Sequence, residues 1–296
     1  MIGAKKVDAL RHREFFLRRR LAQSLDSTLI PDSEARWSPS EPFADFATPE
    51  MGRHRFLAAL HEALQPRTYL EIGVNDGGSL RLSRTKSIGV DPDFAIEREV
   101  HCDLQLVRQT SDEFFAREDP LAHFGGLPID LAFIDGMHLA EFSYRDFLNV
   151  ERLASVGGVV VMDDMLPRNA QEAARNRRTR AWAGDVFKMV DILRERRPDL
   201  VVLPVNTAPT GVLLITALNP SSDVLRDSYN ELLPHLESAD PQDVPEEIRF
   251  RSGSVNAKSV LASTAWKRLV ELREADADRA SVARAVAGLR RIKRLG

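Results

Sequence analysis

The sequence predicts an α/β protein with a seven-stranded sheet, in which five parallel strands are closed by a C-terminal antiparallel hairpin. Short β-branched or aliphatic runs that end in Gly or Asp recur from Thr68 onward, and longer segments with helical periodicity separate them. Such alternation is typical of βαβ units, whose helices cover both faces of a parallel sheet. The last two runs are separated only by residues 206–211, and this short connection predicts the hairpin.

The elements follow one another in a regular order. The expected strands are residues 69–74, 87–91, 105–109, 129–135, 158–163, 200–205 and 212–217. Apolar residues recur every three or four positions in the expected helices, which are residues 53–64, 139–153 and 182–196. Residues 206–211 include Pro209 and Gly211 and are too few for a crossover helix, so the final strands must turn back on each other.

The two ends of the chain differ from this core. Residues 1–52 begin with a helix-like apolar stripe and continue as a Pro-rich linker, and residues 220–296 contain further helical patterns. We therefore expect a core domain over residues 53–219 with a helical extension on each side. The terminal helices are available to cover a substrate or to build a homo-oligomer.

Composition restricts the class of protein. The 296 residues carry 41 Lys plus Arg and 44 Asp plus Glu, and 43% are hydrophobic, as in an ordinary globular protein. A single cysteine, Cys102, excludes an intrachain disulfide framework and a multi-cysteine metal cluster. No apolar run is long enough for a signal peptide or a membrane span, so we expect a soluble, cytoplasmic protein.

A glycine-rich loop follows the first expected strand. Its sequence, Glu71-Ile-Gly-Val-Asn-Asp-Gly-Gly78, precedes an acid, Asp91, at the end of the second strand. Glycines let a backbone approach a ligand closely, and an acid at this separation can accept hydrogen bonds from ribose hydroxyls. Asn75 stands where a dinucleotide motif needs its second glycine, which disfavours NAD. The loop therefore indicates a nucleoside ligand, with an ordinary strand-to-helix turn as the alternative.

A second group of polar residues follows the fourth and fifth strands. Asp135-Gly-Met-His138 ends one strand, and Asp163-Asp164 ends the next. Neighbouring parallel strands end at the same edge of a sheet, so three carboxylates and one imidazole should meet beside the glycine loop. Oxygen ligands suit Mg²⁺, or Mn²⁺, better than a soft metal. The alternative is that the acids cap helices and His138 is a polar residue at a helix start.

Several segments together resemble a known family. They are Tyr69–Ser79, Gly89–Asp91, Asp135–His138, Gly157–Asp164 and Trp182–Lys188. The chain resembles class I S-adenosylmethionine-dependent methyltransferases, which have a Rossmann-like sheet. Within them it is similar to the metal-dependent O-methyltransferases of the macrolide-sugar and cephalosporin-biosynthesis type.

This resemblance implies transfer of a methyl group from S-adenosyl-L-methionine to a hydroxyl of a small molecule or sugar. His138 would be the general base, and Asp135, Asp163 and Asp164 would hold Mg²⁺ or Mn²⁺. A vicinal diol or a catechol would suit such a metal as the acceptor. The residues expected to bind the cofactor are Glu71, Gly73, Asn75, Gly77, Gly78, Ser79, Asp91, Ser111, Asp112 and Asp135.

Other functions remain as alternatives. A nicotinamide-dependent oxidoreductase would share the sheet, but Asn75 and the predicted hairpin disfavour it. A nucleic-acid methyltransferase or binding module would use Arg-rich segments such as residues 168–180. Base N-methyltransferases of this fold typically have an Asn- or Asp-Pro-Pro-aromatic motif where this chain has Asp135 to His138. A scaffold without activity is the last alternative, and the complete set of expected ligands argues against it.

Overall fold

The computed structural model describes residues 42–179, 181–275 and 277–296. The helix predicted near the N-terminus lies outside these residues. The domain boundaries at residues 52 and 219 stay a prediction.

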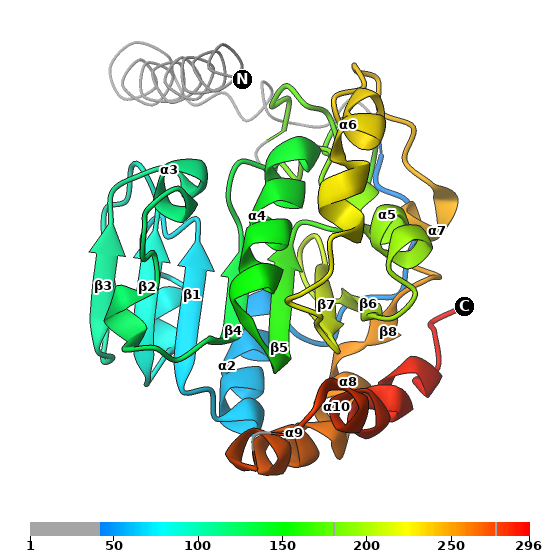
Figure 1. Ribbon diagram of the computed structural model, residues 1–296. Helices are drawn as coiled ribbons and strands as arrows, with labels where there is room; N and C mark the ends of the chain where they lie inside the picture. Colours follow the sequence, from blue (N-terminus) through cyan, green and yellow to red (C-terminus); the bar gives the residue numbers. More distant parts are fainter. Residues whose placement is uncertain (1–41, 180, 276) are drawn as a thin grey trace. The chain divides into compact units, whose positions relative to one another are not determined.

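The central feature is a mixed sheet with the strand order β3-β2-β1-β4-β5-β7-β6-β8 (Figure 1). Its strands are β1 (Thr68–Ile72), β2 (Lys86–Val90), β3 (Leu104–Val107), β4 (Ile129–Ile134), β5 (Ala154–Asp163), β6 (Val201–Asn206), β7 (Val212–Thr216) and β8 (Val255–Asn256). Strands β3, β2, β1, β4 and β5 are parallel, and β6 pairs with β7 in an antiparallel hairpin. The α/β class, the five parallel strands and the hairpin are therefore confirmed.

The described part of the chain forms eight strands rather than the predicted seven. The additional strand, β8, pairs in parallel with β6 through only two residues, so it has no alternation of apolar and polar residues by which it could be predicted. Strand β7 lies between β5 and β6 and is antiparallel to both. The hairpin therefore contributes one reversed strand to an otherwise parallel sheet.

Helices cover both faces of the sheet, as predicted. They are α2 (Arg53–Leu64), α3 (Ser111–Phe115), α4 (Ala140–Leu153), α5 (Lys188–Arg196), α6 (Val224–Leu236), α7 (Glu246–Arg249), α8 (Ala257–Leu261), α9 (Ala265–Glu274) and α10 (Arg279–Val286), with short 3₁₀ turns at Leu80–Leu82, Ala122–Phe124 and Ala287–Arg291. Successive residues of a strand point to opposite faces. Accordingly, Leu70 belongs to the apolar core with α4, α5 and α6, whereas Tyr69 belongs to the core with α2, α8, α9 and α10 (Figure 1).

Most predicted boundaries agree with the structure within two residues, and two differ by more. Helix α5 begins at Lys188 instead of residue 182, because Gly184 has a φ of +65° and interrupts helical geometry. Strand β5 begins at Ala154 instead of residue 158. The strand includes Gly157 and Gly158, and glycine disfavours a strand in a prediction from sequence. No helix of the described residues is long and apolar enough to cross a membrane.

Candidate functional site

The predicted site residues lie along the carboxyl ends of the parallel strands. Strand β1 pairs with β2 on one side and with β4 on the other, so the chain reverses its direction of progress across the sheet at β1. Ligands of open α/β sheets bind outside the strand ends at such a switch point. The glycine loop after β1 and the polar residues after β4 therefore lie next to each other.

Gly73 brings these two motifs into direct contact. Its φ is +88°, and a Cβ atom at this position would lie 1.9 Å from the carbonyl oxygen of Asp135. Its backbone N–H donates to the carbonyl of Val90 at 2.9 Å. Only glycine permits both the backbone conformation and the close approach.

Asp91 organises the middle of the glycine loop. One of its carboxylate oxygens accepts a hydrogen bond from the Asn75 backbone N–H at 2.9 Å, and the other accepts from the Asp93 N–H at 2.7 Å. Asn75 has a φ of +50° and Gly77 a φ of +80°. Each carboxylate oxygen has a second lone pair, so Asp91 retains capacity to accept hydrogen bonds from a ligand.

Glu71 and Ser79 join the two ends of the loop. The Glu71 side chain is fully buried and accepts hydrogen bonds from the Tyr69 hydroxyl at 2.5 Å and the Ser79 hydroxyl at 2.8 Å. Burial raises the pKa of Glu71 to about 8, although both hydrogen bonds act in the opposite direction. These two residues therefore hold the loop to β1, and Gly78 is held by an N–H donated to Asp76 at 2.9 Å.

Ser111 and Asp112 lie in the first turn of α3, after β3. The helix begins with a capping box in which Thr110 and Glu113 bond reciprocally. Asp112 forms an ion pair with Arg145 of α4, with 2.8 Å between the nearest atoms. Ser111 and Asp112 thus follow β3 and contact α4 through the Asp112–Arg145 ion pair.

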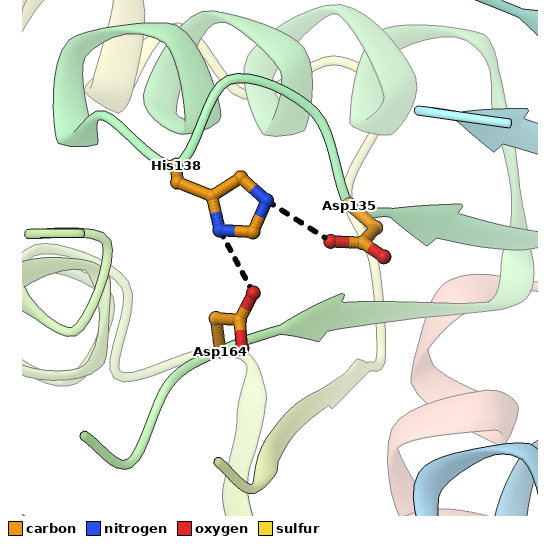
Figure 2. Close-up of side chains that lie close together, drawn as sticks. All are labelled: Asp135, His138 and Asp164. Atoms are coloured by element: carbon orange, nitrogen blue, oxygen red, sulfur yellow. Dashed lines mark ion pairs between the residues drawn. The ribbon is translucent and has the colours of Figure 1, made fainter. Parts of the chain in front are cut away.

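The structure brings together Asp135, His138 and Asp164, which we call the acidic cluster. Figure 2 shows the imidazole between the two carboxylates, with Nδ1 2.8 Å from an Asp164 oxygen and Nε2 3.5 Å from an Asp135 oxygen. One candidate ligand atom from each residue lies within 4.8 Å of the others. Asp135 follows β4 and Asp164 follows β5, so sheet pairing sets their separation.

Two members of the acidic cluster have unusual backbone conformations. His138 has a φ of +58° and Asp164 a φ of +63°, values that side-chain-bearing residues rarely adopt. The Thr210 hydroxyl donates to the Asp164 carboxylate, and the Trp182 ring stacks on the imidazole with 5.1 Å between the ring centroids. Strain of this kind persists where neighbouring groups enforce it and is concentrated at functional sites.

Hydrogen-bond chemistry shows that the acidic cluster suits a cation. A neutral imidazole donates from only one ring nitrogen, so it satisfies either Asp164 or Asp135 but not both. The second contact then places a lone pair against a carboxylate, unless the ring is protonated or a cation lies nearby. The two carboxylates supply the oxygen ligands that a divalent ion such as Mg²⁺ prefers.

Asp163 lies beside the acidic cluster but faces another partner. Its side chain is 1% exposed, and one of its oxygens lies 3.0 Å from Nε of Arg53, the first residue of α2. Burial raises the pKa of Asp163 well above its ordinary value, and the charges of Asp164 and Asp135 act in the same direction. For Asp164, burial also acts to raise the pKa, but His138 and Thr210 outweigh it and the pKa is lowered.

Sequence reasoning did not identify Arg53 and Trp182 as site residues. Each is the first residue of a predicted covering helix. Only the tertiary structure identifies them, because Arg53 contacts Asp163 and Trp182 stacks on His138 across long sequence separations.

A buried arginine holds the loops that carry the acidic cluster. Arg251 is fully buried and donates to the carbonyls of Leu166, Thr207 and Pro209, which flank Asp164 and Thr210 in the chain. Burial lowers the pKa of Arg251 to about 10. The C-terminal segment thus stabilises the site through the hydrogen bonds of Arg251 to these loops.

Two arginines of the segment of residues 168–179 are engaged within the protein. Arg168 pairs with Glu172 at 2.6 Å, and Arg175 pairs with Glu141 at 2.7 Å and with Asp185 at 2.6 Å. Charges neutralised in this way contribute little to an anion-binding surface. Arg177 and Arg178 are exposed, so Arg168 and Arg175 alone count against the nucleic-acid alternative.

A comparison with protein families identifies this region. The model of a family described as a methyltransferase domain matches residues 70–165, which extend from β1 to just beyond β5. These residues are therefore similar to a methyltransferase domain. They include the whole acidic cluster and the glycine loop. No curated protein matches the chain.

Solved structures similar to the chain include several methyltransferases. Cofactor-bound Rv0187 from MTB is 21% identical, with 66% of this chain and 95% of that chain covered and a TM-score of 0.41. The O-methyltransferase TomG from Streptomyces achromogenes, in complex with SAM, is 20% identical over 67% of this chain and 87% of its own, with a TM-score of 0.41. The mycinamycin-pathway methyltransferase MycE, with Mg and SAH, is 17% identical over 55% of this chain and 48% of its own, with a TM-score of 0.40.

Proposed function

We propose that the chain transfers the methyl group of S-adenosylmethionine to a hydroxyl of a small molecule or sugar. Asp135 and Asp164 would ligate Mg²⁺ or Mn²⁺, Asp163 would lie beside the ion, and His138 would be the general base. The observation that carries the proposal is the imidazole of His138, which lies between two carboxylates at the strand ends of a methyltransferase domain. Nothing in the described residues favours a nicotinamide cofactor or a nucleic acid.

The glycine loop is the proposed cofactor site. Asp91 has acceptor capacity for ribose hydroxyls, Gly73 lets the loop pack directly against the Asp135 carbonyl, and Gly77 permits the turn of the loop through its positive φ. Asn75, Gly78, Ser111 and Asp112 would border the nucleoside, whereas Glu71 and Ser79 would act by holding the loop in shape.

The proposed chemistry needs alignment and one proton acceptor. Methyl transfer from a sulfonium is an in-line displacement, so the acceptor oxygen must approach to about 3–3.5 Å from the methyl carbon. A divalent ion, when bound, lowers the pKa of a coordinated hydroxyl. His138 would take the hydroxyl proton on Nε2, while its charge contact with Asp164 and the stacked Trp182 ring keep the imidazole in place.

Calorimetry and a transfer assay test the proposal. We expect S-adenosylhomocysteine to bind and NAD not to bind, and we expect methyl transfer to vicinal diols or catechols to stop on addition of EDTA and to return with Mg²⁺. Asp164→Asn should lose both Mg²⁺ binding and methyl-transfer activity. Asp227→Asn, at an exposed position of α6, should behave as the unmodified protein. Binding of NAD without S-adenosylhomocysteine would refute the proposal, and activity unaffected by EDTA would refute its metal.

A further inference from the structure

Arg53 is the nearest cation to the carboxylates of the site in the described structure. Its Nε lies 3.0 Å from Asp163, and the charges of Asp163, Asp135 and Asp164 all raise the pKa of its guanidinium. A guanidinium at this position faces the same group of acids as a bound divalent ion would.

The position of Arg53 is set by its backbone. The Arg53 N–H donates to the carbonyl of Ala208 at 3.1 Å, and the Ala208 N–H donates to the carbonyl of Met51 at 3.0 Å. Ala208 belongs to the β6–β7 connection, which also carries Thr210, the donor to Asp164. One connection therefore anchors both the arginine and a carboxylate of the acidic cluster.

The contact between Arg53 and Asp163 is a charge contact without well-directed hydrogen bonds. The Nε atom of Arg53 and both carboxylate oxygens of Asp163 are buried, and none has a hydrogen-bond partner of good geometry among the described residues. A strong arginine–carboxylate pair normally forms two parallel hydrogen bonds. Asp163 is therefore held mainly by charge, and its oxygens retain the capacity to ligate another cation.

We propose that Arg53 is a tethered counter-cation that competes with the divalent ion for Asp163 and so keeps this carboxylate out of the ion's coordination shell. The inference rests on the metal site of the proposed function. The positive charge of Arg53 neutralises the negative charge of Asp163. The two negative charges of Asp135 and Asp164 then neutralise a divalent ion. Loss of the guanidinium would release Asp163 as a third carboxylate ligand and tighten ion binding.

Binding of Mn²⁺, followed by electron paramagnetic resonance without cofactor or acceptor, tests this competition. Four proteins are compared: the unmodified chain, Arg53→Gln, Asp163→Asn and the double variant. We expect Arg53→Gln to bind Mn²⁺ about tenfold more tightly. We expect Asp163→Asn to weaken binding in both backgrounds, because it removes one negative charge, but by a larger factor, about tenfold, when Arg53 is absent, because a ligand is then lost as well.

Two further variants control the experiment. Arg55→Gln removes an exposed arginine from the same helix and should leave Mn²⁺ affinity unchanged. Arg53→Lys keeps the charge and should bind Mn²⁺ more weakly than Arg53→Gln, which separates loss of charge from loss of folding. Circular dichroism and the affinity for S-adenosylhomocysteine verify that each variant is folded.

The possible results are distinguishable. If Asp163→Asn weakens Mn²⁺ binding equally with and without Arg53, or if Arg53→Gln binds no more tightly than the unmodified chain, the competition does not exist. If none of the proteins binds Mn²⁺, both the competition and the proposed metal are refuted, and binding of S-adenosylhomocysteine then decides whether methyl transfer itself stands.

Discussion

The glycine loop and the acidic cluster lie side by side, but their carboxylates have different partners. In the loop, Glu71 and Asp91 accept hydrogen bonds from hydroxyls and backbone N–H groups, all of them neutral donors. In the cluster, Asp135 and Asp164 share one imidazole, and Asp163 beside them faces a guanidinium. The loop is complete within the chain, whereas the cluster depends on charge and so is built to respond to a cation.

The largest expected effect tests the role of the imidazole in the acidic cluster. We predict that His138→Asn lowers the methyl-transfer rate about a thousandfold, because no other described group takes the proton, and leaves S-adenosylhomocysteine affinity unchanged. Asparagine tolerates the positive φ of this position, so the backbone should be preserved. Single-turnover kinetics and calorimetry give the two quantities.

The matched control for this change is His235→Asn on exposed α6, which should retain full activity. A His138→Asn variant that loses cofactor affinity as much as rate would show that the loop and the cluster are not separate units.

The next effect tests the contact between the two regions. We predict that Gly73→Ala lowers the free energy of unfolding by about 3 kcal/mol, because the new Cβ meets the Asp135 carbonyl oxygen and the backbone has a positive φ. Urea denaturation measures the change. Gly288→Ala is the comparison, since a Cβ there meets no atom within 4 Å, and it should be near neutral.

The last effect is a pH dependence and concerns the buried Glu71 carboxyl group of the loop. Burial raises the pKa of Glu71 to about 8, so the folded chain holds a proton that the unfolded chain releases nearer pH 4.5. The stability from this group is therefore present below pH 4.5 and is lost as pH rises toward 8, by about 1.4 kcal/mol for each pH unit.

Unfolding measured from pH 4.5 to 8 in the unmodified chain and in Glu71→Gln isolates this contribution. The difference between the two proteins should grow across the window and level off above it. A difference independent of pH would mean that Glu71 is ionised throughout.

Local sequence patterns were sufficient for most of the fold. Helix α2 begins and ends at the predicted residues, because its apolar spacing is regular over three turns. The hairpin followed from the length of one connection. Strand β8 was missed because two residues carry no period, and the start of α5 was misplaced because the conformation of Gly184 depends on a tertiary contact with His138.

For the site, the sequence predicted which residues lie at the strand ends but not how they pair. Asp135, His138 and Asp164 meet because adjacent strands end together, which topology alone predicts. Arg53 approaches Asp163 only because the β6–β7 connection anchors the start of α2, a long-range contact with no local pattern. The sequence therefore could not predict that Arg53 is the ion-pair partner of Asp163.

Arg251 has a consequence for the order in which the molecule is made. Its guanidinium fastens the loops around Asp164 and Thr210, yet it follows both of them by many residues in the chain. A ribosome that has just synthesised residues 70–165 has not yet supplied this anchor. During synthesis the glycine loop therefore emerges first, and the loops around Asp164 and Thr210 acquire their final support only when the C-terminal segment emerges.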